Sequence, residues 1–266
     1  MDISLLCSQG RVADRTDDTL AGSRYTAQHL AALLGKKEIT VGQLSPAEKD
    51  KWPESLDKAR PHLEKMAAAL SQELSKNKRV ILTTSTCPTS LATIPEVVKK
   101  YPDIKLLWFD GHGDFNTPTS SDSGYLGGMV VSAVCGVWDA ELDATIPPEN
   151  VIIVGAHDID AAEQILLEQH RVRVIPPAHV KPETILPLIG DSPIWIHVDW
   201  DVLEPGNVPA EYKVKGGITL EQLRAIFRAL PIDQVKGLEL AEFSAQDDDN
   251  QPWLNNIETL VTDLLN

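Results

Sequence analysis

Features that would place this sequence in several large classes of protein are scarce or missing. No apolar run approaches the ~20 residues that a membrane-spanning helix needs, and the start, MDISLLCSQGRVADR, lacks the basic flank and apolar stretch of a signal peptide. Basic residues are few: 24 Lys and Arg stand against 39 Asp and Glu, a net charge of −15. Nucleic acid is therefore excluded as a partner, because binding its phosphates needs a basic surface.

Cysteine is also scarce. Cys7, Cys87 and Cys135 are odd in number and far apart, which argues against a disulfide framework and predicts a reducing compartment. The hydrophobic fraction of 42% and the charged fraction of 24% are those of ordinary globular proteins. We therefore expect a cytoplasmic protein with neither nucleic acid nor a membrane as its partner.

The sequence does contain a regular alternation of strand-like and helix-like segments. Besides a first strand at the start of the chain, β-branched runs occur at 78–86, 104–110, 150–158, 171–176, 193–199 and 235–243. Helix-like stretches occur at 19–35, 54–76, 90–100, 161–170, 182–189 and 219–229. This alternation is typical of an α/β fold with a mostly parallel sheet covered on both faces. No repeat or shift in composition divides the chain, so we expect one domain, residues 1–266.

Proline and glycine mark two further features. Pro61 is expected to kink or interrupt the helix at 54–76, because proline lacks the backbone N–H that a helix interior uses. The segment 203–217 is rich in both residues and is expected to be a long functional loop.

Acidic residues and a histidine lie where three predicted strands end. These residues are Asp110, His112 and Asp114, then Asp199 and Asp201, and finally Glu242. Ligands of open α/β sheets bind at the carboxyl ends of the strands, and alternate residues of an extended chain point the same way. Carboxylates with one imidazole suit Mn²⁺ or a similar divalent ion. A lone D-x-H-x-D is often only a turn, but burying four like charges without a cation is prohibitive.

At these residues the sequence resembles the ureohydrolases, the family of arginase and agmatinase. The matching segments are FDGHGDFNTP at 109–118, HVDWDVLEP at 197–205 and GLELAEF at 237–243. The resemblance implies an arginase-like three-layer α/β/α sandwich on an eight-stranded, parallel sheet. It also implies that Asp110 and Asp199 bridge two metal ions. His112 and Asp201 would complete the shell of one ion, and Asp114 would belong to the other.

Two positions depart from the family pattern. The family has a histidine ligand where this chain has Cys87, 23 residues before Asp110. A thiolate is a poor ligand for Mn²⁺, so we expect one metal position to be weak; the alternative is that Cys87 is a small buried residue. The family also has a proton-shuttling histidine where this chain has Gly127. We expect Gly127 to leave open space for a substrate hydroxyl or water, the alternative being a tight turn.

One branch of the family is similar through these departures, namely the hydrolases of Nω-hydroxy-L-arginine in D-cycloserine biosynthesis. The shared segments include SQGRVADR at 8–15, SLAT at 90–93 and GYLGGM at 124–129. The resemblance implies hydrolysis of Nω-hydroxy-L-arginine to L-ornithine and hydroxyurea. Asp114 would take a proton from the attacking water and return it to the leaving nitrogen. Glu242 would pair with the guanidinium group.

The amino-acid end of the substrate would be held by other residues. Matching positions imply Asn116 and Ser123 for the carboxylate, and Asp160, with Glu163 as a weaker candidate, for the ammonium group. Both acids could equally be first-turn residues favoured by a helix dipole. His197, two residues before Asp199, is interpreted as a core histidine.

Two other functions stay open. The chain could be a ureohydrolase of arginine, agmatine or another guanidino or formimidoyl compound, or a catalytically silent relative. A homo-oligomer is also open, since family members often form trimers or hexamers.

Overall fold

The computed structural model describes residues 2–246 and 249–266. Its centre is one eight-stranded sheet in which every strand pair is parallel, in the order β2-β1-β3-β8-β7-β4-β5-β6. The strands are β1 (Ile3–Ser8), β2 (Ile39–Val41), β3 (Arg79–Thr83), β4 (Lys105–Phe109), β5 (Val151–Val154), β6 (Arg173–Ile175), β7 (Ile194–Asp199) and β8 (Val235–Ala241). The expected parallel, eight-stranded α/β fold is confirmed.

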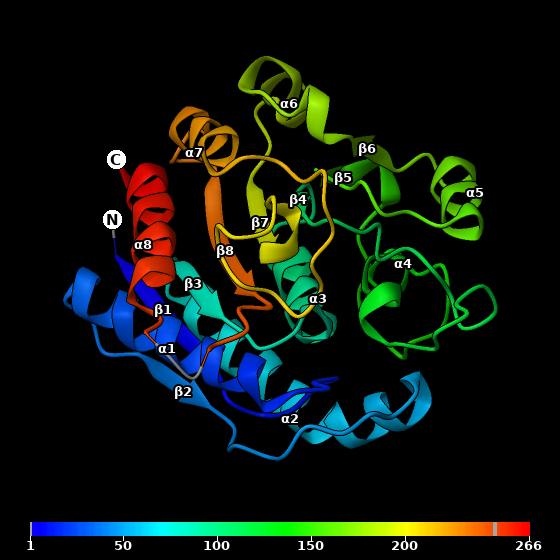
Figure 1. Cartoon of the computed structure of the whole chain (residues 1–266), viewed down its shortest axis with the longest axis horizontal. Coiled ribbons are helices and arrows are strands. Elements are labelled where there is room, and N and C mark those ends of the chain that lie inside the picture. Colours follow the sequence, from blue (N-terminus) through cyan, green and yellow to red (C-terminus); the bar gives the residue numbers. More distant parts are fainter. Residues whose placement is uncertain (1, 247–248) are drawn as a thin grey trace.

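Helices cover both faces of this sheet (Figure 1). They are α1 (Asp17–Leu34), α2 (Trp52–Ser75), α3 (Ser90–Lys100), α4 (Val130–Val134), α5 (Ala161–Gln169), α6 (Pro182–Ile189), α7 (Leu220–Ala229) and α8 (Gln251–Leu265). One apolar cluster joins the sheet to α2, α3 and α4, and a second joins it to α1, α6, α7 and α8. Neighbouring strand residues alternate between the clusters: Trp108 packs in the first and Phe109 in the second. This alternation produces the three layers.

Three elements are absent from the sequence-based prediction. β2 and α4 have three and five residues, too few to show a periodicity. The helix α8 does carry a helical signal, because its buried residues recur every three or four positions: Leu254, Ile257, Leu260, Val261 and Leu264.

Pro61 does not end a helix. α2 runs without interruption from Trp52 to Ser75 and contains Pro61, so the expected interruption is wrong and the kink stays a prediction. Pro61 and Asp57, four residues before it, both lie on the exposed side. Water can therefore hydrogen-bond the Asp57 carbonyl that the missing N–H leaves free.

The strand order brings distant parts of the chain to one place. β3, β8, β7 and β4 are consecutive neighbours and parallel, so their carboxyl ends lie along one edge at the middle of the sheet. The segments that follow these strands contain the acidic residues identified in the sequence. Of the helices in the described residues, none is long and apolar enough to cross a membrane.

Candidate metal centre and substrate pocket

The predicted metal ligands meet at the carboxyl edge of the four central strands. Asp110 directly follows β4, Asp199 ends β7 and Glu242 directly follows β8. Cys87 opens a short 3₁₀ helix, η1 (Cys87–Thr89), after β3. A second such helix, η5 (Trp200–Val202), follows β7 and carries Asp201. Residues from four separated segments are thus placed around one point.

Three groups of these side chains have ligand atoms within 4.8 Å of one another. The groups are Asp110 with His112 and Asp201, Cys87 with Asp110 and Asp114, and Cys87 with Asp199 and Glu242. Asp110 belongs to two groups, and all members except the half-buried His112 are buried. The structure therefore brings together every residue that the sequence nominated as a metal ligand.

Short contacts orient the carboxylates. His112 Nδ1 lies 3.0 Å from Asp201 Oδ2 and 3.3 Å from Asp110 Oδ1. The other Asp201 oxygen accepts a hydrogen bond from the backbone N–H of Gly111 at 2.9 Å. Asp199 Oδ1 accepts one from the backbone N–H of Asp201, also at 2.9 Å. Each aspartate after β7 is thus fixed through one oxygen by the backbone of the loops.

The electrostatics of this cluster call for a cation. Burial, reinforced by neighbouring carboxylates, raises the pKa values of Asp114, Asp199 and Asp201. Burial opposes the charged form of His112, but its hydrogen bonds to Asp110 and Asp201 raise its pKa. Among the residues that the structure describes, His112 is the only basic side chain in an ion pair with these acids. The donor set therefore fits divalent cations, whose charge would let the remaining acids ionise together.

Cys87 has contacts that the sequence did not reveal. Its Sγ lies 3.3 Å from Asp199 Oδ2 and 3.3 Å from Nε2 of His197. The other ring nitrogen of His197 lies 3.0 Å from Glu239 Oε2, and the ring stacks on Trp108. Burial and the charge of Asp199 raise the pKa of the Cys87 thiol. His197 is the buried, hydrogen-bonded core histidine that we expected. It also contacts the Cys87 thiol through Nε2.

Two acids of the centre adopt an unusual backbone conformation. Asp114 has a φ of 49° and Glu242 a φ of 64°, in the left-handed region that favours glycine. Backbone strain at non-glycine residues is concentrated at functional sites. These two residues are also the ones that the sequence analysis nominated for proton transfer and guanidinium binding.

A cavity of about 370 Å³ opens beside the carboxylate cluster. It is lined by residues that include Cys87, His112, Asp114, Asp199 and Glu242. One oxygen of Glu242, Oε1, accepts a hydrogen bond from the backbone N–H of Cys87, whereas Oε2 is buried without a partner. A buried carboxylate oxygen in this state favours a ligand that brings N–H donors.

The residues expected to bind the amino-acid end of a substrate also line this cavity. Asp160 is the N-cap of α5: its Oδ1 accepts from the backbone N–H groups of Ala162 and Glu163, and its Oδ2 accepts from Asn116 Nδ2 at 2.7 Å. Burial raises the pKa of Glu163 to about 7. Ser123 lies exposed at the rim. Of the two acids, Glu163 does lie in the first turn of α5, as the alternative held, whereas Asp160 caps the helix, and both line the cavity.

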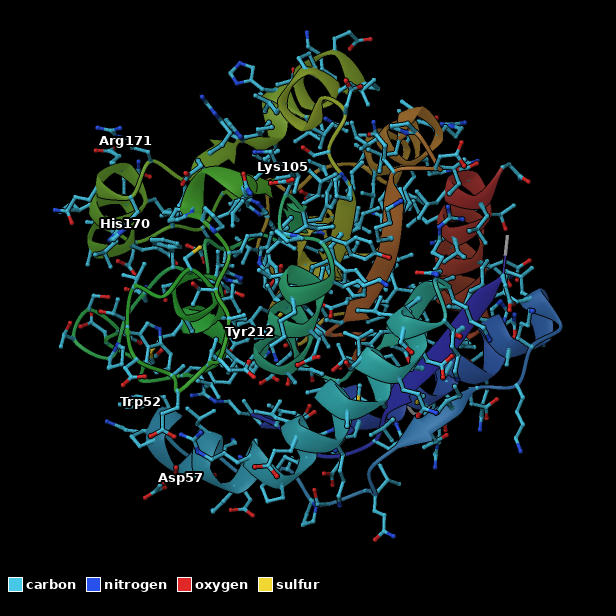
Figure 2. The ribbon with its side chains drawn as sticks, turned by 180° about the vertical axis from the view of Figure 1, so that it is seen from behind. Trp52, Asp57, Lys105, His170, Arg171 and Tyr212 are labelled. Atoms are coloured by element: carbon cyan, nitrogen blue, oxygen red, sulfur yellow. The ribbon has the colours of Figure 1, made fainter. Side chains whose placement is uncertain are left out.

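Three further cavity residues were missed by sequence reasoning, namely Arg15, Tyr125 and Tyr212. The Arg15 guanidinium lies 4.1 Å from the centre of the Tyr125 ring, and its Nη1 lies 3.4 Å from the hydroxyl of Tyr212. Tyr212, labelled in Figure 2, belongs to the loop 203–217. That loop thus contributes to the cavity, as we expected. Arg15 and Tyr125 lie within SQGRVADR and GYLGGM, two segments that carry the family resemblance, but neither segment shows that the two residues meet at one cavity.

Gly127 lines the cavity, but the space into which a side chain at this position would extend is not open. A Cβ atom there would lie 2.3 Å from Cε1 of Tyr125, so the expectation of free room for a hydroxyl or water is wrong. The alternative of a tight turn is confirmed, because the backbone N–H of Met129 donates to the carbonyl of Leu126 at 3.1 Å and closes a turn across Gly127 and Gly128. Gly127 is needed because the ring of Tyr125 lies against its Cα.

An α/β sandwich that gathers carboxylates and an imidazole at the carboxyl edge of its parallel strands has the layout of a metal-dependent hydrolase. Comparison with known proteins agrees. The family model described as "Arginase family" matches residues 18–264. An N(omega)-hydroxy-L-arginine amidinohydrolase from Streptomyces lavendulae is 44% identical over 92% of this chain and 90% of its own. The chain therefore belongs to the arginase family, and it is a hydrolase of that family.

Solved structures confirm the fold. The arginase of Entamoeba histolytica, solved with L-ornithine, has a TM-score of 0.87 at 19% identity and covers 99% of this chain and 97% of its own. The arginase of Bacillus caldovelox has a TM-score of 0.85 at 21% identity, with the same coverage of both chains. These similarities show that the sandwich is the arginase fold.

Proposed function

We propose that this protein hydrolyses the guanidino group of Nω-hydroxy-L-arginine, which gives L-ornithine and hydroxyurea. The observation that carries the proposal is the 44% identity, over nearly the whole of both chains, to a relative named for that activity. The unpartnered Glu242 Oε2 in a carboxylate-lined cavity independently supports a cationic guanidino substrate.

We propose Mn²⁺ as the metal, in a two-ion site. Asp110 and Asp199 would bridge the ions, His112 and Asp201 would complete one shell, and Asp114 would belong to the other. Cys87, near Asp110 and Asp114, offers that second ion a soft sulfur in place of an imidazole. A bound divalent cation lowers the pKa of water, so that hydroxide is available at neutral pH.

The protein's own residues would perform the rest of the reaction. Glu242 accepts N–H bonds from the guanidinium group through its unpartnered Oε2 and so orients the central carbon. Collapse of the tetrahedral intermediate requires a proton on the departing nitrogen. Asp114 is buried and its pKa is raised, which suits a carboxylate that takes a proton from the attacking water and passes it on.

The other end of the cavity fits an α-amino acid. Asn116 and Ser123 supply an amide and a hydroxyl for a carboxylate, and Asp160 supplies a carboxylate for an ammonium group. Glu163 is a second candidate for that group. Asn116 donates a hydrogen bond to Asp160 at 2.7 Å, so the two side chains are already held next to each other without a ligand.

We extend the proposal to the setting of the protein. The three free cysteines favour a reducing compartment, the cytoplasm. The resemblance to hydroxyarginine hydrolases favours a role in antibiotic biosynthesis. Since strands from residue 3 to residue 241 form one sheet, we retain the interpretation of residues 1–266 as a single domain, and a homo-oligomer stays open.

A product assay tests this function. The purified protein is incubated with Mn²⁺ and, separately, Nω-hydroxy-L-arginine, L-arginine and agmatine, and ornithine, hydroxyurea, urea and putrescine are measured. We expect ornithine and hydroxyurea from the first substrate. Urea from arginine or agmatine alone would assign an ordinary ureohydrolase, and no product from any substrate would favour a silent relative.

A further inference from the structure

Tyr125 carries a buried hydroxyl for which the structure shows no partner. The residue is only 9% exposed, and its hydroxyl oxygen makes no hydrogen bond. The residue lines the same cavity as Glu242, whose Oε2 is also buried and unpartnered. Buried polar atoms are nearly always hydrogen-bonded. Two residues that line one cavity thus each carry a buried, unpartnered polar atom, one a donor and one an acceptor, which favours a ligand that brings an acceptor for the first and a donor for the second.

The position of this hydroxyl is fixed by its surroundings. The Cα of Gly127 lies against the ring, since a Cβ there would come within 2.3 Å of Cε1 and 2.9 Å of Cζ. The guanidinium of Arg15 lies 4.1 Å from the ring centre. The ring thus occupies the space where a side chain at position 127 would begin, and its hydroxyl cannot swing away freely.

The hydroxyl is also kept in its donor form. Burial, followed by the charge of Glu242, raises the pKa of Tyr125 well above its usual value. The phenol therefore keeps its proton at neutral pH and can donate it to a ligand oxygen.

The two candidate substrates differ at just this point. A guanidinium group has N–H donors and no acceptor, so L-arginine can satisfy Glu242 but offers nothing to a phenol proton. An N-hydroxyguanidine adds an oxygen that accepts a hydrogen bond. Sites that hold a buried polar group for a substrate discriminate strongly against an analogue that leaves this group unpaired.

We propose, resting on the proposed function, that Tyr125 is a specificity-determining residue that donates its hydroxyl proton to the N-hydroxyl oxygen of the substrate. Glu242 accepts the neighbouring N–H groups of the same N-hydroxyguanidine. Gly127 is required because the ring of Tyr125 lies over its Cα. A histidine at position 127, as the family has, would clash with the ring of Tyr125, so the loss of this histidine and the presence of the phenol depend on each other.

The variant Tyr125→Phe tests this inference, because it removes the hydroxyl and leaves the ring. We expect kcat/KM for Nω-hydroxy-L-arginine to fall at least 10-fold and kcat/KM for L-arginine to change less than 3-fold. The melting temperature without ligand should stay unchanged or rise, since a buried unpaired group is removed. Tyr101→Phe, at the end of α3, is the matched control and should leave both efficiencies unchanged.

A binding measurement separates this inference from the proposed function. Calorimetry with N-hydroxyguanidine and with guanidinium should show a preference for the former in the wild type and a loss of it in Tyr125→Phe, whatever substrate is turned over. Equal losses on both probes, or an unchanged preference, would overturn the role of Tyr125. If the Phe variant does not fold, Gly127→Ala, which must displace the ring, should reduce the preference in the same way; an unchanged preference there would also overturn it.

Discussion

Cys87 is the residue that we expect to weaken one of the two metal positions. Its thiol is buried and has a raised pKa, and it lies 3.3 Å from both Asp199 and His197. A neutral thiol binds a hard cation poorly. We therefore expect the wild-type protein to retain fewer than two ions per chain after dialysis.

The substitution Cys87→His should raise this metal content, as measured by mass spectrometry of dialysed protein. Because His197 already lies against the thiol, the double variant Cys87→His with His197→Ser gives the new ring more room and should gain at least as much. Cys135→His, outside the three ligand groups, serves as the control. Two tightly held ions in the wild type would contradict the prediction.

Asp199 and Asp201 differ in their predicted roles although both lie at the carboxyl end of β7. We expect Asp199→Ala to abolish activity and metal binding together, because Asp199 would contact both ions. Asp201→Ala should lose mainly one ion. Asp160→Asn, which changes a cavity carboxylate outside the three ligand groups, should leave the metal content unchanged. Full retention of metal in Asp199→Ala would refute the assignment of the bridge.

The residues of the site differ in how well the sequence revealed them. Asp110, Asp199 and Glu242 could be predicted because each stands at the end of an apolar strand, and parallel strands end at the same edge. Arg15 and Tyr125 could not, because their contact joins the loop after β1 to the segment before α4. Neither segment contains a pattern that predicts the contact between Arg15 and Tyr125.

At the scale of elements, the short 3₁₀ helix η2 (Gly127–Met129) shows how the packing of a neighbouring side chain restricts which residue a position can hold. Gly127 and Gly128 are neighbours without positive φ, yet a Cβ at Gly127 meets the Tyr125 ring at 2.3 Å, while one at Gly128 meets nothing within 4 Å. The two glycines therefore have different requirements.

We expect Gly127→Ala to lower the free energy of unfolding by about 1–3 kcal/mol, the usual cost of overpacking a core. Gly128→Ala should be close to neutral. Urea unfolding of both variants measures the difference. Combining Gly127→Ala with Tyr125→Ala should cost less than the sum of the two single changes, since the second removes the ring. Equal effects at the two glycines would show that the ring does not constrain position 127.

The prediction of elements from sequence depended on their length and pattern. Most buried strands and amphipathic helices were found within a few residues, whereas β2 and α4 are too short for any period to appear. The helix α8 was missed although its apolar residues recur at helical spacing. The interruption expected at Pro61 was wrong because a proline on the solvent side of a helix leaves the unpaired carbonyl four residues before it to water. The sequence alone did not say which side Pro61 would occupy.

At the scale of the whole molecule, the strand order explains why the site lies at the centre of the sheet. β1, β3, β8, β7 and β4 are neighbours although they are far apart in the sequence. Regular alternation of strands and helices was sufficient to predict the class of fold. The number of strands came from the family resemblance, whereas the order of the strands was not predicted, since no local pattern specifies which distant strands pair.

The most direct test of the proposed function is the ratio of kcat/KM for Nω-hydroxy-L-arginine to that for L-arginine, measured at saturating Mn²⁺ and one pH. With a phenol donor in the cavity and no imidazole at position 127, we expect a ratio of at least ~100, equal to about 2.7 kcal/mol of differential transition-state binding. Comparable efficiencies, or a preference for L-arginine, would contradict the assignment.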